Sequence, residues 1–372
     1  MAIGMNAGTM ARSPSLSLRF WLGRCLGLLG MLLAASAVIF AVLDILPGNV
    51  AQVMLGPDAD PAAVHALEVQ LGLDAPAWQR YLQWLGGLLH GDLGTSQAYG
   101  VPVAGLLAER LALTLPLTVL AMALATVMAL VAGVFAALHH RRWGDVGVMT
   151  LTQLGMATPG FWLGMLLIVV FAVWLGWLPS GGFEGWSVAA GGADGGSVAG
   201  AGEAAGGGAA YAGAAHAGAA HAGTGGGWLA GLWHGLQFLL LPALALACVQ
   251  GAILARFVRA SLLEVQGEAF TRTALAKGLN HRQVLWRHVA RNAAVPVLTV
   301  AGMQFAELLS GAVVIENVFS LPGLGRLMAQ SIANRDLLVV RNGVLLLVAM
   351  VVVINFIVDA LAVLIDPRLR GR

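Results

Sequence analysis

The sequence predicts an all-α polytopic membrane protein, with six transmembrane helices and a helical hairpin between helices 4 and 5. Composition is the first observation: of 372 residues, 59% are hydrophobic and 10% are charged, whereas a soluble protein carries about 25% charged residues. The second is a series of apolar stretches, each near or above the roughly 20 residues that a spanning helix needs. The third is one strongly basic polar segment between two of these stretches.

The predicted spans alternate with polar segments of unequal length. The spans are 20–46, 112–138, 148–178, 228–255, 294–316 and 342–364. The segments outside them are 1–19, 47–111, 139–147, 181–227, 256–293, 317–341 and 365–372. Pro159 falls inside the third span, where neighbouring helices can satisfy the carbonyl group that a proline leaves free.

The first apolar segment has a signal peptide as its alternative, because Ala35-Ser36-Ala37 resembles a cleavage site. The apolar run continues past that site, so cleavage would cut inside it. A spanning helix is therefore preferred.

Basic residues predict the orientation. With residues 1–19 in the cytoplasm, 15 of the 20 lysine and arginine residues lie on the cytoplasmic side or at its boundary. The five exceptions are Arg80, Arg110, Arg326, Arg335 and Arg341. This bias fits the positive-inside rule and places both termini in the cytoplasm. The net charge of +2 predicts no nucleic-acid partner.

Segment 181–227 consists mostly of glycine and alanine and is predicted to be a disordered external insertion, because it cannot bury enough apolar surface to offset its ordering entropy. Its repeated AGAAH unit ends at His216 and His221. Two ligands on such a chain are too few for a predicted metal site.

The basic segment, 268–299, predicts a helix, a glycine turn and a second helix. Its positive charge comes from Arg272, Lys277, Arg282, Arg287 and Arg291. Gly278 suits the left-handed turn that ends a helix. Asn280 and Gln283 suit a variant of the capping box at the next helix, and Pro296 is expected near the first turn of the span that follows.

The order Glu268-Ala269, Lys277-Gly278, Arg287-His288, Arg291-Asn292 and Pro296 resembles the cytoplasmic coupling loop of permease subunits in binding-protein-dependent ABC importers. The dipeptide, oligopeptide and nickel permease family is the most similar. Further matching segments cover nearly all of the chain except the tail and the insertion. They are LDILPGN (43–49), GLDAPAWQRYLQWL (72–85), GDLGTS (91–96), ENVFSLPGLGR (316–326), Arg335-Asp336, Asn355 with Asp359, and Asp366-Pro367-Arg368.

The resemblance implies a pore subunit in the bacterial inner membrane that moves peptides or a related small solute, such as a nickel chelate. It implies a second homologous permease, two ABC ATPase subunits and a periplasmic binding protein as partners. ATP and magnesium would bind the ATPase subunits, so no cofactor is expected here. The implied ATPase contact comprises Glu268, Ala269, Thr271, Arg272, Lys277 and Gly278. The implied binding-protein side comprises Glu316, Phe319, Pro322 and Gly323.

The residues also allow a different role for the basic segment, that of a loop resting on anionic membrane lipid. Lipid binding needs the charges but not the glycine and capping residues, so a rigid lever gripped by an ATPase is favoured.

A polar stripe in the fifth span marks a candidate translocation path. Gln304, Glu307 and Gly311 share one helical face, and a charge at mid-span costs roughly 2.5 to 3.5 kcal/mol. One hypothesis is that this face lines the path and that Glu307 favours a cationic group such as a peptide's amino terminus. An interhelical hydrogen bond is an equally open interpretation.

Two further features, the cysteines and the segment 72–85, predict no chemistry of their own. Cys25 and Cys248 lie in apolar stretches and are expected to be buried thiols. The segment 72–85 predicts a short amphipathic helix capped near Asp74, with aromatic residues suited to the membrane interface.

Other function classes fit less well. An ion-coupled secondary transporter remains the alternative, although the chain lacks a convincing internal repeat. A membrane enzyme lacks a catalytic constellation. Since the sequence contains no Walker A motif, ATP hydrolysis would belong to another chain.

Overall fold

The computed structural model describes residues 18–45, 55–56, 59–70, 74–183 and 228–365. Most of this part of the chain is helical. The helices are α1 (Leu18–Ile45), α3 (Pro61–Gln70), α4 (Ala77–His90), α5 (Val103–Leu138), α6 (Trp143–Ala157), α7 (Gly160–Leu167), η1 (Ile168–Trp174), α8 (Trp228–Gly267), α9 (Ala269–Ala276), α10 (His281–Val284), η2 (Leu285–Val289), α11 (Ala290–Val318), α12 (Leu324–Ala333) and α13 (Leu337–Ile365).

The predicted polytopic helical fold is confirmed. Five helical stretches are long and apolar enough to cross a membrane: Leu22–Ile45, Val103–Leu138, Trp233–Gly267, His281–Val318 and Leu337–Val363. The pair Trp143–Ala157 and Gly160–Trp174 supplies a sixth span if the two are counted together, although they meet at 101°.

The third predicted span, 148–178, is divided into two helices in the structure. Helix α6 ends at Ala157 and α7 begins at Gly160. Pro159 has no N–H to continue the helix, and a residue before proline is pushed toward extended backbone, as the φ of −87° and ψ of 129° at Thr158 show. The chain therefore turns sharply where a tolerated kink was expected.

Several predicted boundaries also need correction. Helix α5 begins at Val103, inside the predicted external segment, and α8 continues to Gly267, inside the predicted loop 256–293. The continuation of α8 is supported by buried Val258 and Leu262 on one of its faces. Pro296 lies inside α11, not near its first turn.

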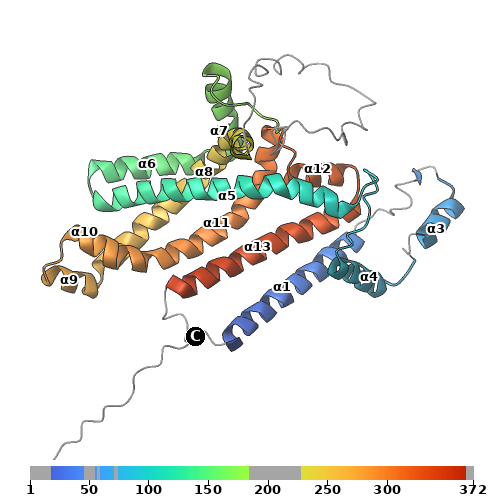
Figure 1. Ribbon diagram of the computed structural model, residues 1–372, viewed down its shortest axis with the longest axis horizontal. Coiled ribbons are helices and arrows are strands. Elements are labelled where there is room, and N and C mark those ends of the chain that lie inside the picture. Colours follow the sequence, from blue (N-terminus) through green and yellow to red (C-terminus); the bar gives the residue numbers. More distant parts are fainter. Residues whose placement is uncertain (1–17, 46–54, 57–58, 71–73, 184–227, 366–372) are drawn as a thin grey trace, which may run out of the picture.

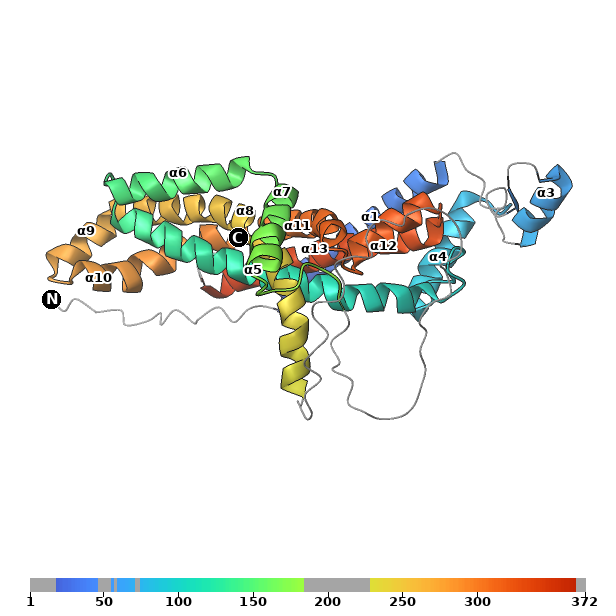
Figure 2. The same ribbon diagram turned by 90° about the horizontal axis from the view of Figure 1, so that it is seen from above.

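Most of the long helices run along one axis of the molecule, but the first part of α8 runs across it (Figures 1 and 2). The α9–α10 hairpin lies at one end of this axis, and α12 with α4 lies toward the other. Helices α5 and α8 pack most extensively, through small residues that let backbones approach closely. A Cβ at Gly133 would lie 2.7 Å from Val258, and one at Gly251 would lie 3.2 Å from the Ala125 carbonyl oxygen.

Helix α4 differs from its prediction in two respects. It begins after Pro76, with no side-chain cap, so Asp74 does not cap it. Trp84 is only 8% exposed and donates its ring N–H to Asn342 Oδ1 at 2.9 Å. Trp78 is 66% exposed, and its place at the membrane interface stays a prediction.

Two predicted features lie partly or wholly outside the described residues. The insertion 181–227 is described only up to residue 183, so His216 and His221 are outside, and the tail is described only from residue 18.

The two cysteines are free. Cys25 is exposed, although it was expected to be buried, and Cys248 is half-buried.

Candidate functional site

The hairpin at 268–289 folds as its residues predict. Gly278 adopts a φ of +87°, and its N–H donates to the carbonyl of Leu275 at 2.9 Å, which closes α9 in the way typical of glycine. At α10, Asn280 Oδ1 accepts the Gln283 N–H at 2.8 Å and Gln283 Oε1 accepts the Asn280 N–H at 3.2 Å. The predicted capping box is confirmed.

Buried residues fix the hairpin to α8. Thr271 is 4% exposed, and its hydroxyl donates to the carbonyl of Val265 at 3.0 Å. Ala274, Val284 and Leu285 belong to the same buried cluster as residues near the end of α8. The hairpin is therefore packed against its own span and does not hang from it as a loose loop.

The remaining residues predicted for the ATPase contact face outward. They are Glu268, Ala269, Arg272, Lys277 and Gly278. Of the six predicted positions, Thr271 alone is an internal anchor. The exposed positions lie on α9 or within two residues of its ends, and the α9–α10 hairpin lies at one end of the long axis (Figure 1).

A second fixed contact lies near the same end. Arg259 on α8 binds Asp145 at the start of α6, from Nε to Oδ1 at 2.6 Å and from Nη2 to Oδ2 at 2.7 Å. The backbone N–H of Arg141 donates to the same carboxylate at 3.1 Å, and His140 Nδ1 lies 3.3 Å away. Sequence reasoning missed this cluster, because its partners are 114 residues apart.

The three residues of the predicted polar stripe on α11 differ in exposure in the structure. Gln304 is 3% exposed and donates to the backbone carbonyl of Gln250 at 3.4 Å. Glu307 is exposed, and Gly311 is half-buried. The exposed stripe that passes through Glu307 consists instead of Thr299, Met303, Glu307, Ser310 and Val314.

Glu307 borders a pocket of about 220 Å³ between α7, α8 and α11. Gly160 and Phe161, the first residues after the break in the third span, form one wall, and Gly311 forms part of another. Gln250 also lines the pocket, with its Nε2 donating to Glu307 Oε2 at 3.5 Å. Sequence reasoning missed Gln250 and Phe161 because their position depends on the turn at Pro159.

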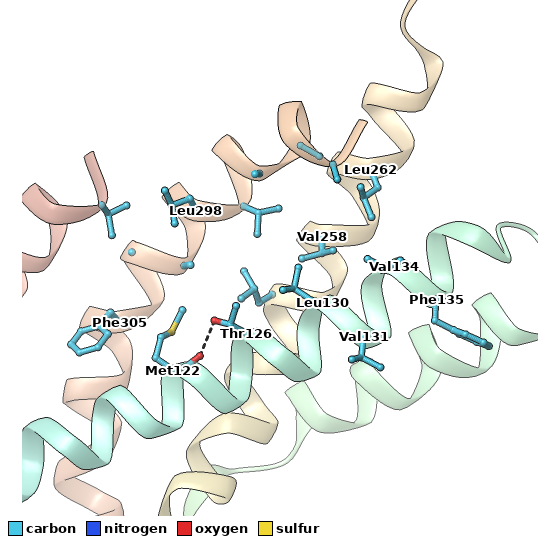
Figure 3. Close-up of a pocket in the computed structure, with 18 of the residues that line it drawn as sticks. Met122, Thr126, Leu130, Val131, Val134, Phe135, Val258, Leu262, Leu298 and Phe305 are labelled. Carbon is cyan, nitrogen blue, oxygen red and sulfur yellow. Dashed lines mark hydrogen bonds between the residues drawn. The ribbon is translucent and has the colours of Figure 1, made fainter. Parts of the chain in front are cut away.

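A larger, apolar groove of about 810 Å³ lies on another face of α11, against α5, α8 and α13. Figure 3 shows Met122, Leu130, Leu298 and Phe305 around it, with the hydroxyl of Thr126 bonded to the Met122 carbonyl. The groove thus offers hydrocarbon and almost no free hydrogen-bonding groups. It suits acyl chains or apolar side chains better than a polar solute.

At the opposite end, Glu316 organises the segment that joins α11 to α12. It is fully buried, and its Oε2 accepts the backbone N–H groups of Gly325 at 2.8 Å and Arg326 at 3.2 Å. Thr114 Oγ1 donates to Glu316 Oε1 at 2.6 Å and accepts the Leu324 N–H at 2.8 Å. The first N–H groups of α12 are thereby satisfied.

The other residues predicted for this side have related roles. Phe319 and Gly323 are buried, and Pro322 is half-buried. A Cβ at Gly323 would lie 2.1 Å from the Glu316 carboxyl carbon, so only glycine fits. These residues position α12 and leave its outer face, including exposed Gln330 and Ile332, as the accessible surface.

The GDLGTS segment and Arg335-Asp336 meet in the structure. Asp336 is fully buried, and its Oδ2 accepts hydrogen bonds from Ser96 Oγ at 2.5 Å and from the Ala98 N–H at 3.1 Å. Its Oδ1 accepts the Val339 N–H at 3.2 Å, which caps the start of α13. Two matching segments more than 200 residues apart therefore form one contact.

Asp359 has a partner within the chain, since it pairs with Arg24 of α1. No group of three metal-ligating side chains is found in the described ranges, and Asn355 contributes no feature to the site.

Comparisons with known proteins show the family to which the chain belongs. Residues 129–371 match the family of binding-protein-dependent transport system inner membrane components, and residues 17–118 match its N-terminal region. The chain is 35% identical over 353 residues to the glutathione transport system permease protein GsiC of Escherichia coli K12, covering 95% of this chain and 99% of the relative.

A peptide transport system permease homologue of Brucella abortus is 38% identical over 340 residues, covering 91% of this chain and 95% of the relative. Among solved structures, a crystal structure of an amino acid ABC transporter with histidines overlaps with a TM-score of 0.43 at 15% identity, covering 71% of this chain and 94% of that one.

This family consists of multi-pass inner membrane subunits that are not themselves enzymes, and it works with a substrate-binding protein and with ATPase subunits. The two matched ranges together cover most of the chain. They include the hairpin at 268–289 and the predicted path residues Gln304, Glu307 and Gly311. The chain is a permease subunit of a binding-protein-dependent ABC importer, in the dipeptide and oligopeptide family.

Proposed function

We propose that this chain forms one half of the pore of an ATP-driven importer that takes up peptides or a related small solute. The named relatives transport glutathione or peptides, and a nickel chelate stays within the proposed range. A second homologous permease would complete the pore. Two ATPase subunits, which bind ATP and magnesium, would lie on the cytoplasmic side, and a periplasmic binding protein would deliver the solute.

The observation that carries this proposal is the rigid hairpin between the end of α8 and the start of α11. Its turn at Gly278 is exposed, whereas Val284 anchors it in the buried cluster and the Thr271 hydroxyl bonds the Val265 carbonyl. Force applied to Lys277 or Arg272 by a closing ATPase dimer would thus reach the span itself. Lipid binding alone would not need this packing.

The path would follow the exposed stripe on α11. Thr299, Glu307 and Ser310 lie on it, and such groups are costly against lipid. A second permease facing this stripe would cover it and leave a polar channel between the two subunits. The apolar groove on the other side of α11 offers no comparable lining.

The orientation proposed for the complex places α9 and α10 in the cytoplasm and α12 outside. Both termini are then cytoplasmic, in agreement with the bias of basic residues. The binding protein would meet the outer face of α12, which Glu316 and Gly323 hold in place. Anionic lipid would contact the basic residues that the ATPase leaves uncovered.

Gly278→Asp in the assembled complex tests the coupling role. A Cβ at position 278 meets no atom within 4 Å, so the substitution leaves the core intact while straining the turn and adding a negative charge to the contact. We expect normal membrane insertion and loss of ATP-dependent uptake of a fluorescent tripeptide. Gly278→Asn is the control, since asparagine tolerates the left-handed conformation. Full uptake by Gly278→Asp would exclude the lever.

A further inference from the structure

We propose that the pocket between α7, α8 and α11 binds the primary ammonium group of the transported solute. This inference rests on the proposed function, because it names the chemistry that the path recognises. The ligand class is a small solute with a free amine, such as the amino-terminal residue of a short peptide.

The charged group of the pocket, the Glu307 carboxylate, is a hydrogen-bond acceptor. Glu307 is a carboxylate on an exposed part of a spanning helix. Among the described residues, the side chain of Glu307 has one hydrogen-bond partner, Gln250 Nε2, at the long distance of 3.5 Å. The side-chain oxygen of Gln250 is buried and has no hydrogen-bond partner in the same part of the chain.

An ammonium group matches this carboxylate. It carries three N–H donors and no acceptor, so it can donate to the Glu307 carboxylate while Gln250 Nε2 keeps its own bond to that group. Hydrogen bonds between ions are roughly twice as strong as neutral ones. A neutral amide or an acetylated amine has fewer donors and no charge, and would leave the carboxylate uncompensated.

The rest of the lining favours a cation over an anion. Phe161, 45% exposed, presents an aromatic ring, whose face attracts cations. Leu246, Val249 and Ile315 are apolar and strengthen the electrostatic attraction by excluding water. The described lining contains no lysine or arginine, so a carboxylate group would meet no positive side chain there.

The break in the third span creates this space. Because α7 leaves α6 at 101°, Gly160 and Phe161 face α8 and α11. The volume of about 220 Å³ is below the roughly 300 to 1,000 Å³ of pockets that enclose a whole small ligand. The pocket therefore suits one end of the solute, with the remainder along the α11 stripe.

Charged thiol reagents test the pocket without transport. Cys25 and Cys248 are replaced by alanine, and Val314, which is 48% exposed and lines the pocket, is replaced by cysteine in the complete transporter in membrane vesicles. The probes are the ethylammonium and ethylsulfonate methanethiosulfonates. We expect the ammonium reagent to react about tenfold faster relative to its rate with free thiol.

Glu307→Gln in this background should remove that preference, and Glu109→Gln, an exposed carboxylate elsewhere on α5, should keep it. Equal rates for the two reagents before the Glu307 change would overturn the proposal. So would a lack of reaction with either reagent, because the pocket would then be closed in the complex.

Uptake provides the second measurement. Trialanine and N-acetyl-trialanine compete with a fluorescent tripeptide for the wild-type importer, and the ratio of their inhibition constants is compared with the ratio for Glu307→Gln. The receptor is the same in both, so a change reports the permease. We expect the preference for the free amine to fall about tenfold, with partial rescue in Glu307→Asp.

An unchanged ratio in an importer that still transports would refute the ammonium site and leave the proposed function standing. Uptake without ATP would instead refute the proposed function, whatever the ratio.

Discussion

Arg259 donates two hydrogen bonds to Asp145, at 2.6 and 2.7 Å, and thereby joins α8 to the start of α6. The Asp145 side chain is 5% exposed and that of Arg259 is 23% exposed. A planar guanidinium that binds both oxygens of a carboxylate fixes geometry as well as charge. The helix that carries the hairpin therefore cannot move independently of α6 while this pair is intact.

Removing one partner should be costly. Arg259→Ala leaves the buried carboxylate without its counter-ion and is expected to destabilise the chain by about 3 to 5 kcal/mol, measured as a lower melting temperature in detergent. Arg259→Lys keeps the charge but loses the two-point contact, so an intermediate effect is expected. Arg256→Lys, at an exposed arginine one turn earlier, is the control and should change little.

The contact of Gly323 with Glu316 gives a second prediction. A Cβ at position 323 would lie within 2.4 Å of the carboxyl atoms, so Gly323→Ala must displace Glu316 and release the N–H groups of Gly325 and Arg326. Faster hydrogen exchange at the start of α12 is the expected signature. Gly86→Ala, where a Cβ meets nothing within 4 Å, should leave exchange unchanged. Equal protection in both variants would contradict this account of α12.

The hairpin was predictable from sequence because its determinants are local. Gly278 needs only its own backbone freedom, and the capping box of Asn280 and Gln283 acts across three residues. The spans were predictable for a similar reason, since length and hydropathy are properties of contiguous stretches. Their ends were less well predicted, as the extension of α8 to Gly267 shows.

The pocket could not be predicted in the same way. Helical spacing correctly placed Gln304 near the face of Glu307, but burial of Gln304 depends on its contact with the backbone of Gln250, 54 residues away. The direction of α7 depends on how strongly the chain bends at Pro159, and the presence of a proline in the sequence does not set that angle of 101°. Long-range pairs such as Asp145 with Arg259 leave no periodic signal at all.

The contact between Ser96 and Asp336 should be measurable as a coupling energy. Ser96→Ala and Asp336→Asn each remove or weaken a bond to a buried carboxylate, and hydrogen bonds to charged groups contribute about 1.5 to 3 kcal/mol. We expect the two changes together to cost less than the sum of the single changes, by about 1 kcal/mol or more, in urea or thermal unfolding of the purified chain. Strict additivity would mean that the two segments are independent.

Loss of the Asn280 cap should separate ATP hydrolysis from transport. Asn280→Ala removes the acceptor for the Gln283 N–H, at a cost of about 1 kcal/mol, and loosens the second arm of the hairpin while the buried anchor at Val284 remains. In the complete importer we expect fewer solute molecules to be moved per ATP hydrolysed, with membrane insertion unaffected. Asn280→Ser restores a capping oxygen and should recover most of this ratio. If Asn280→Ser and Asn280→Ala transport equally poorly, the side chain acts through direct contact with the ATPase and the stiffness of the hairpin is not what limits coupling.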